Sequence, residues 1–286
     1  MDDFALEKFC RKRYHLVMPR FFLLCVLFVL AVGCQFSRSF TPISPGQYLG
    51  SNSSRQGIEA LERGNLTEAE KRLEDAVKYD KNDINHRRHY AEVLWQQGKY
   101  QEALQQLDEA LKRGGQNSAI LHISLAEKYL ERGDYATAHY HADEAVRLNS
   151  QDYHSWALRG RAKRLQASRE VGYVEHTMAM LHQAREDYIR AVSLSPNNQE
   201  LLAELATVQM SCGQPEQALA TWFTLQSLYP QGSEPNEVLI GITETLMVLR
   251  RFDEAELNLI AIRQRGLEHS EAGQRLQAMI GAGVRR

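Results

Sequence analysis

The stretch QGKYQEALQQLDEA, residues 97–110, decides the fold of this chain of 286 residues. A related stretch precedes it at residues 63–76, RGNLTEAEKRLEDA, and another follows at residues 132–145, RGDYATAHYHADEA. The second residue of each is a glycine, which can take the left-handed conformation that ends a helix. Each then carries two alanines seven residues apart, which lie on one helix face because seven residues make nearly two turns. The pattern predicts helices joined by tight turns.

The first alanine of this pattern recurs outward from these stretches along most of the chain. It falls at successive spacings of 34, 35, 46, 34 and 37 residues, at Ala69, Ala103, Ala138, Ala184, Ala218 and Ala255. A near-period of this length is what a helix-turn-helix unit requires when each unit buries its apolar face against its neighbours. Only seven prolines occur and no stretch alternates with period two. We therefore expect an all-α array.

The chain resembles the tetratricopeptide repeat (TPR), a pair of antiparallel helices with small residues at repeat positions 8, 20 and 27. Position 20 is the recurring alanine, and position 8 is Gly57, Ala91, Ala126, Gly160, Ala206 and Thr243. The resemblance implies a TPR-type α-solenoid of about six helix-turn-helix repeats over residues 51–267. Residues 268–286 are expected to form a C-terminal capping helix and tail, because a solvating cap is needed at the end of such an array.

Repeat 4, about 153–198, departs from the period because it holds twelve additional residues. Two longer helices with a turn near Gly172 would absorb them. The resulting hairpin would project about two turns beyond its neighbours. Protruding additions often carry function, and neutral drift is the alternative explanation.

The N-terminal segment carries an export signal. Residues 21–32 form an apolar run, preceded by the basic residues Arg11, Lys12, Arg13 and Arg20. The run is about 12 residues long, whereas a helix needs about 20 to cross a bilayer, so we expect a signal peptide over residues 1–33. A translation start at Met18 would leave a more compact basic leader.

The end of this signal, LAVGC at residues 30–34, resembles the bacterial lipobox. The resemblance implies that Cys34 carries a lipid and becomes the mature amino terminus, which would anchor the protein to a membrane. An uncleaved membrane anchor and plain secretion are the alternatives. Residues 34–50 would then comprise the lipidated cysteine and a flexible tether, since they contain few charges and no helical period. Alternatively, Phe40 and Tyr48 pack on the first helix.

Composition and charge exclude several functions. The net charge of the chain is −2, and residues 1–33 contribute +2, which leaves −4 for the rest. Nucleic-acid binding needs a concentrated basic face, so this net negative charge argues against a nucleic-acid partner. After removal of the signal and lipidation of Cys34, Cys212 is the one remaining thiol, so a disulfide scaffold and a four-cysteine zinc site are excluded.

Catalytic motifs are also absent from the sequence. It contains no serine elbow, phosphate-binding glycine loop, dinucleotide fingerprint or zinc-protease helix. His139 and His141 are two residues apart and so face different directions on a helix, whereas His86 and His89 could share a face but lack a third ligand nearby. We interpret all four as surface or groove residues. We therefore expect a protein that is not an enzyme and that has no cofactor, no metal ion and no small-molecule substrate.

The TPR resemblance implies a concave partner-binding groove lined by positions 2, 5, 9, 12 and 13 of the first helix in each repeat. We expect the groove residues to be Arg88, Trp95, Ile123, Leu130, Arg161, Arg164, Met210, Ile240 and Met247. A largely apolar line of this kind suits an amphipathic helix or an extended peptide. Alternatively, these side chains pack against the second helices of adjoining repeats. The arginines among them belong to a basic cluster that is either a solvated surface or an anion-binding patch.

These observations lead to one main functional hypothesis and two alternatives. The main hypothesis is a lipid-anchored, non-enzymatic adaptor of the bacterial envelope that faces the periplasm and binds a peptide or helix of an envelope protein during complex assembly. Its layout is similar to that of TPR lipoproteins that help assemble outer-membrane proteins or type IV pilus secretin rings, and Gln35 favours the outer membrane. The alternatives are an accessory or regulatory subunit of a cell-wall polymer enzyme, and a hydrolase that uses a groove carboxylate and a histidine.

Overall fold

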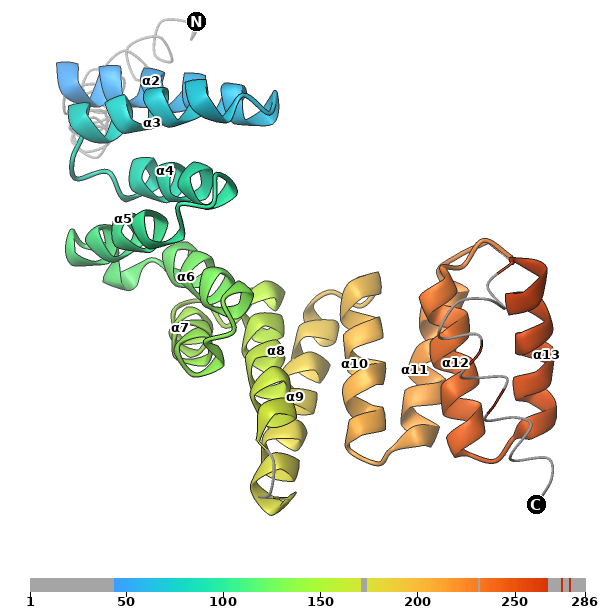
Figure 1. Cartoon of the computed structure of the whole chain (residues 1–286). Coiled ribbons are helices and arrows are strands. Elements are labelled where there is room, and N and C mark those ends of the chain that lie inside the picture. Colours follow the sequence, from blue (N-terminus) through green and yellow to red (C-terminus); the bar gives the residue numbers. More distant parts are fainter. Residues whose placement is uncertain (1–43, 171–173, 231, 267–273, 275–277, 279–286) are drawn as a thin grey trace, which may run out of the picture. The chain divides into compact units, whose positions relative to one another are not determined.

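The computed structural model describes residues 44–170, 174–230 and 232–266, together with Gln274 and Ala278. The chain divides into two compact units, residues 1–48 and 49–286, and nearly all of the described residues belong to the second. The expected signal peptide and Cys34 lie outside the described residues. So does the expected capping helix, apart from two isolated positions. The described part of the chain is helical and contains no strand (Figure 1).

Twelve α-helices in the described residues form six pairs. The pairs are α2 (Pro45–Glu62) with α3 (Leu66–Tyr79), α4 (Ile84–Gln96) with α5 (Tyr100–Lys112), α6 (Ala119–Glu131) with α7 (Tyr135–Leu148), α8 (Tyr153–Arg169) with α9 (Val174–Leu194), α10 (Gln199–Ser211) with α11 (Pro215–Ser227), and α12 (Asn236–Val248) with α13 (Phe252–Gln264). A short 3-10 turn, η1 (Gly115–Asn117), precedes α6. We call the even-numbered members the first helices and the odd-numbered members the second helices. From α4 to α12, each helix packs on the helix before it and the helix after it (Figure 1).

Small residues lie where the helices of a pair meet. All six of the recurring alanines at position 20 are fully buried, at 0% exposure. A Cβ on Gly57 of α2 would come 2.5 Å from Cγ of Leu73 on α3, and a Cβ on Gly160 of α8 would come 3.1 Å from the carbonyl oxygen of Ala184 on α9. Larger side chains would therefore force the helices apart. The predicted all-α fold with close-packed helix pairs is confirmed.

The turns inside the five pairs whose turns the structure describes share one backbone conformation. Gly98, between α4 and α5, has a φ of 78°, in the left-handed region that a residue without a Cβ adopts without strain. Arg250 occupies the equivalent place between α12 and α13 with a φ of 59°. It is the one non-glycine residue with a positive φ among the described residues, and the last turn therefore carries a steric cost that the others avoid.

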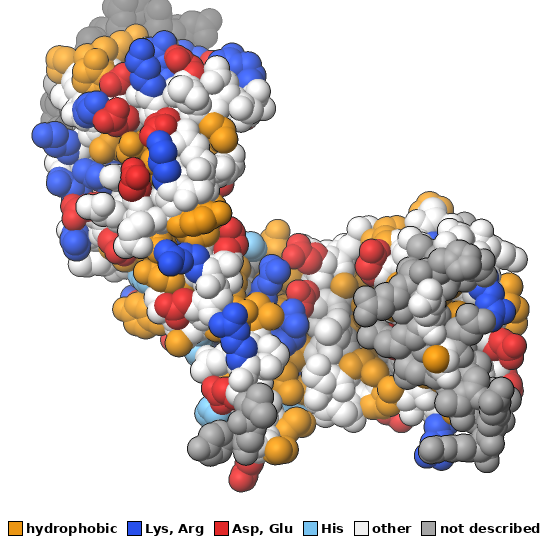
Figure 2. All heavy atoms as spheres, in the orientation of Figure 1, with side chains coloured by type: hydrophobic (Ala, Val, Ile, Leu, Met, Phe, Trp, Pro, Cys, Tyr) orange, Lys and Arg blue, Asp and Glu red, His pale blue; other side chains and the backbone are white. Residues whose placement is uncertain are grey.

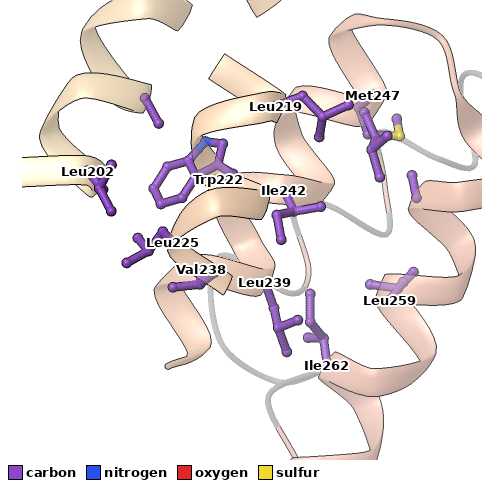
Figure 3. Packing of buried hydrophobic residues seen from close by; sticks show 13 residues of the cluster. Leu202, Leu219, Trp222, Leu225, Val238, Leu239, Ile242, Met247, Leu259 and Ile262 are labelled. Carbon is purple, nitrogen blue, oxygen red and sulfur yellow. The ribbon is translucent and has the colours of Figure 1, made fainter. Parts of the chain in front are cut away.

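The buried core consists of separate clusters. The largest lies between α10 and α13, where the Trp222 ring fills the space beside Gly241, and Met247 packs with Leu219 and Leu259 in the same cluster (Figure 3). A second cluster joins α4, α5 and α6. The cluster that joins the first pair to α4 is small and contains Ala60, Ala69, Leu73 and Val93.

Helix α2 begins earlier than the sequence predicted. The expected tether ran to residue 50, whereas α2 starts at Pro45. The Gln47 amide donates to Oγ of Ser44 at 3.2 Å, and the Ser44 amide donates to Oε1 of Gln47 at 3.0 Å, which is a capping box. Proline suits the first helical position because its missing N–H would have no partner there. Residues 45–50 are therefore helical rather than part of a tether.

The fourth pair is longer than the others. Helices α8 and α9 have 17 and 21 residues, whereas the helices from α10 to α13 have 13 each. Gly172, the expected turn, lies outside the described residues. The end of α8 contacts the preceding pair, because Nη1 of Arg169 donates to the Gly133 carbonyl at 2.9 Å and its guanidinium lies 4.4 Å from the ring centre of Tyr135.

A buried carboxylate joins α9 to α8. Asp187 is 3% exposed. Its oxygens accept hydrogen bonds from Nη2 of Arg159 at 2.7 Å and from Nζ of Lys163 at 3.0 Å. Arg159 also reaches Asp143 of α7 at 2.6 Å. The charges of this network compensate one another, and it fixes the long pair against the third pair.

Candidate protein-binding groove

Two adjoining cavities open on the first helices of the central pairs. The larger, of about 430 Å³, is lined by residues of α4, α6 and α8, which are Glu92, Glu127, Lys128, Leu130, Glu131, His154, Leu158, Arg161 and Leu165. The smaller, of about 240 Å³, is lined chiefly by residues of α8 and α10, including Tyr153, Leu201 and Glu204. Three α8 residues, His154, Leu158 and Arg161, line both. We call the two cavities together the first-helix groove.

Ion pairs between successive first helices hold the walls of the groove. Nζ of Lys128 on α6 lies 2.9 Å from a carboxylate oxygen of Glu92 on α4. Nε2 of His154 on α8 lies 2.8 Å from Oε1 of Glu127 on α6. The hydrogen bond to this carboxylate raises the pKa of His154 above its ordinary value, because it favours the charged imidazolium.

Arg161 differs from the other charged residues of the groove. It is exposed, and it forms no ion pair or hydrogen bond with any other residue in the described part of the chain. Leu158 and Leu130 lie beside it on the floor of the larger cavity. The groove therefore combines apolar surface with one guanidinium that is free to bind an anionic group.

The face shown in Figure 2 has no extended basic patch. Lys and Arg side chains are interspersed there with Asp and Glu side chains. Affinity for a phosphate backbone requires neutralisation of several phosphates by neighbouring cations. The visible face does not offer such a cluster.

The structure brings some of the predicted groove residues together. Leu130 and Arg161 line the larger cavity. Arg164 lies next to the smaller one, and its guanidinium forms an ion pair with Glu204 at 2.8 Å that raises the pKa of Arg164 against the opposing effect of burial. Ile123 is half-buried against the small core cluster that also contains Leu158.

Trp95 and Arg88 lie on α4 but outside the first-helix groove. Trp95 is 7% exposed, and its Nε1 donates to Glu131. Its remaining exposed edge faces a separate cavity of about 600 Å³ at the α4–α5 turn, beside Tyr100. Arg88 is half-buried, and burial lowers its pKa.

The three predicted residues of the last two pairs also lie apart from the groove. Met210 and Ile240 are half-buried, and neither lines one of the two cavities. Met247 is 7% exposed and belongs to the core cluster of α10–α13. The prediction that Met247 lines an open groove is therefore wrong, because the side chain packs among α11, α12 and α13 (Figure 3).

Several groove residues were not among those predicted. His154 stands at repeat position 2, and Glu127 stands at position 9, the position that the predicted Arg161 occupies in the next repeat. Positions 2 and 9 point toward the partner in the family pattern, so a comparison of these positions in neighbouring repeats could have identified the Glu127–His154 pair. Lys128 and Leu158 stand at positions 10 and 6, which the family pattern does not mark as groove positions.

The histidines are more buried than the sequence predicted. His86, His122 and His141 are 5%, 5% and 7% exposed. His86 still lines a cavity beside α2, so the interpretation as surface or groove residues is wrong for His141. Nδ1 of His122 lies 3.1 Å from Nδ1 of His141, between α6 and α7. Burial, followed by the neighbouring His122, lowers the pKa of His141 to about 4.

Neither a metal site nor a membrane-spanning helix is found among the described residues. They contain no group of three or more His, Cys, Asp or Glu side chains placed to hold a metal ion. None of the described helices has both the length and the apolar composition needed to span a bilayer.

Comparisons with known proteins agree with the fold. Residues 54–118 match the family model of the tetratricopeptide repeat. The structure is similar to that of PilW, described as a widely conserved type IV pilus biogenesis factor, with a TM-score of 0.65 and 18% identity over 80% of this chain and 98% of that one. No curated protein matches the chain significantly.

Two other solved structures are also similar in fold, at nearly the same sequence identity. PilF of Pseudomonas aeruginosa gives a TM-score of 0.64 with 17% identity over 82% of this chain and 99% of that one. YrrB, a TPR protein described as having an unusual peptide-binding site, gives 0.57 with 17% identity over 72% of this chain and 97% of that one. Residues 54–118 therefore carry the tetratricopeptide-repeat pattern, and the described residues have the fold of a TPR-type α-solenoid.

Proposed function

We propose that the protein is a membrane-anchored, non-enzymatic adaptor whose first-helix groove binds a peptide or helix of an envelope protein during complex assembly. The observation that carries the proposal is the pair of adjoining cavities that share His154, Leu158 and Arg161. Stacked helical repeats commonly use such extended surfaces to bind other proteins. The groove joins four successive first helices, which suits an elongated ligand better than a compact small molecule.

The chemistry of the groove supports a partner segment with a carboxylate between apolar side chains. Leu130, Leu158 and Leu201 offer apolar contacts, while Arg161 offers an unpaired guanidinium. The acidic residues Glu92 and Glu127 are already paired within the groove. A partner carboxylate would therefore bind Arg161 without displacing an existing ion pair.

Two observations support a location at the envelope. The N-terminal sequence has the basic and apolar pattern of an export signal and ends in a lipobox-like LAVGC at residues 30–34. PilW, which is similar in fold, is described as a type IV pilus biogenesis factor. The outer membrane facing the periplasm is the location that we propose, and proteins of pilus assembly are the first partners to test.

The groove can be tested by photo-cross-linking in cells. Benzoylphenylalanine placed at Tyr153, which lines the smaller cavity and is 38% exposed, is expected to cross-link to an envelope protein. Arg161→Glu reverses the free charge and should reduce the cross-linked product by about tenfold, which corresponds to about 1.4 kcal/mol. The control Arg190→Glu makes the same charge change at an exposed residue of α9. A product that persists in Arg161→Glu would exclude the groove as the binding site.

The anchor needs a separate experiment. Cells grown with radioactive palmitate should label the protein, and Cys34→Ala should abolish the label. The control Cys212→Ala removes a buried free thiol and should leave the label unchanged. Labelling that persists without Cys34 would rule out the lipoprotein assignment and leave the groove proposal intact.

A further inference from the structure

A second surface lies on the second helices and changes character halfway along the array. Its marker is repeat position 25, five residues after the recurring alanine. The residue is acidic in the first three repeats, at Glu74, Asp108 and Asp143, and apolar in the last three, at Ile189, Phe223 and Ile260. The last three are 42%, 43% and 43% exposed. Large apolar side chains are therefore exposed to solvent at the same repeat position on α9, α11 and α13.

The pattern is more specific than scattered exposure. Single apolar residues on a surface are ordinary. Here, however, three successive second helices each carry a large exposed apolar residue at repeat position 25. Leu257 of α13, three residues before Ile260, is 68% exposed and widens the row. On α11 the neighbouring exposed residues are small and uncharged, and they include Ala220, Thr224 and Ser227. The second helices of the last three pairs thus present apolar surface that the described residues leave uncovered.

Unpaired carboxylates accompany the apolar row. Several charged residues of the second helices form ion pairs, for example Lys78 with Glu74 at 2.9 Å on α3 and Arg251 with Glu254 at 2.6 Å at the start of α13. In the last two pairs the exposed carboxylates Glu216, Asp253 and Glu256 form no ion pair within the described part of the chain. They lie toward the N-terminal ends of α11 and α13, along one edge of the apolar row.

We infer that this surface, which consists of Ile189, Phe223, Leu257 and Ile260 with the acidic edge of Glu216, Asp253 and Glu256, is a docking site for an amphipathic helix of another protein. The partner helix presents apolar side chains on one face and Lys or Arg along one edge. This second-helix face is distinct from the first-helix groove, so it adds a second binding site to the proposed adaptor.

The geometry favours a helix as the occupant. The apolar row crosses α9, α11 and α13, which alternate with the packed helices α10 and α12 (Figure 1). An elongated segment can contact all three, and a helix with apolar residues at i, i+3, i+4 and i+7 offers a continuous stripe. The unpaired carboxylates favour a basic edge on that helix and repel an anionic lipid surface or a nucleic acid.

Binding can be measured with two synthetic peptides and the full-length protein. One is an 18-residue fluorescein-labelled helix with leucine on one face and lysine on the other, and the second has glutamate in place of lysine. Fluorescence anisotropy is expected to show binding of the lysine peptide only.

The protein variants test which residues bind the peptide. Phe223→Ser combined with Ile260→Ser should weaken the affinity for the lysine peptide by about tenfold. The register-matched control Asp108→Ser on α5 and the groove variant Arg161→Glu should leave it unchanged. Equal binding of the glutamate peptide, or no loss in the double variant, would overturn the inference.

The natural occupant is identified by cross-linking from the same surface. Benzoylphenylalanine at Phe223, with the same group at Asp108 as the control, is expected to cross-link in cells to an apolar, Lys- or Arg-bearing helix of another protein, located by mass spectrometry of the joined peptides. Glu216→Lys with Asp253→Lys should reduce that product at least about fivefold, because the edge then repels the partner. Products confined to residues 267–286 of this chain, to a second copy, or to the level of the Asp108 control would each contradict the proposal. Loss of the Phe223 product with an intact Tyr153 product would leave the groove proposal standing.

Discussion

Gly241 shows how tightly single residues are constrained in the core. A Cβ at this position would lie 2.5 Å from Cε2 and Cζ2 of Trp222. Gly241→Ala is expected to lower the free energy of unfolding by about 1–3 kcal/mol, because the overpacking exceeds the gain in helix propensity. Urea denaturation followed by circular dichroism measures the change. Ser227→Ala, at an exposed position of α11, is the control, and a Gly241→Ala variant as stable as the parent would contradict the packing described.

The His122–His141 pair predicts sensitivity to acid. Burial lowers the pKa of His141 to about 4, so the unfolded chain takes up the proton first, below its ordinary pKa of about 6.5. The stabilisation is complete above pH 6.5 and is lost as the pH falls from 6.5 toward 4. A decrease of about 1–2 kcal/mol between pH 7 and pH 5 is expected from this residue.

The urea midpoint at the two pH values measures this effect. His141→Phe keeps a ring against Tyr129 and should make the pH dependence shallower. His176→Phe changes a histidine whose side chain is 64% exposed and should not. An unchanged slope in His141→Phe would show that other groups control the acid response.

The residue-level predictions from sequence succeeded where sterics alone decide. Ala69 and Ala184 had to be small because two helix axes approach closely there, and this requirement is visible in a single chain. Exposure is different, as Leu130 and Met247 show. They share repeat position 12, yet Leu130 lines a cavity and Met247 is buried in a core. The register fixes the direction of a side chain but not how closely the neighbouring helices surround it.

At the level of the helices, the long fourth pair depends on one buried carboxylate. Asp187→Ala would leave Arg159 and Lys163 without their shared partner in a largely buried site. The expected loss is about 3–5 kcal/mol, because an uncompensated buried charge is costly. Thermal unfolding by calorimetry measures it. Glu144→Ala, which breaks the exposed pair with Arg147, should cost less than about 1 kcal/mol. Similar losses in the two variants would argue against a structural role for the network.

Helix ends were predictable to the extent that their caps are local. The tether was predicted too long because the Ser44–Gln47 capping box was not considered, although its pattern, S-x-x-Q with proline between, is present in the sequence. The Arg169 contacts with Gly133 and Tyr135 could not be predicted in the same way. They join residues more than thirty positions apart and depend on how α8 lies against the third pair.

For the molecule as a whole, the divided core predicts uneven local stability. The first pair has a small buried cluster around Leu73, whereas α10–α13 share a much larger one. Amide hydrogen exchange should therefore be faster in α3 than in α12, by about tenfold or more. Leu73→Ala should accelerate exchange in α3 and α4 and leave α12 unchanged, and Leu246→Ala should do the reverse. Uniform acceleration across all helices in either variant would indicate a single cooperative core.

The neighbour-by-neighbour packing of the helices also has an evolutionary consequence. A helix pair that touches only the pairs beside it can be copied in tandem without a redesign of the remainder, since the duplicated unit meets a junction that already exists. Gene-level duplication would lengthen the reach of such a protein in steps of one hairpin, and its descendants could then acquire new ligands unit by unit.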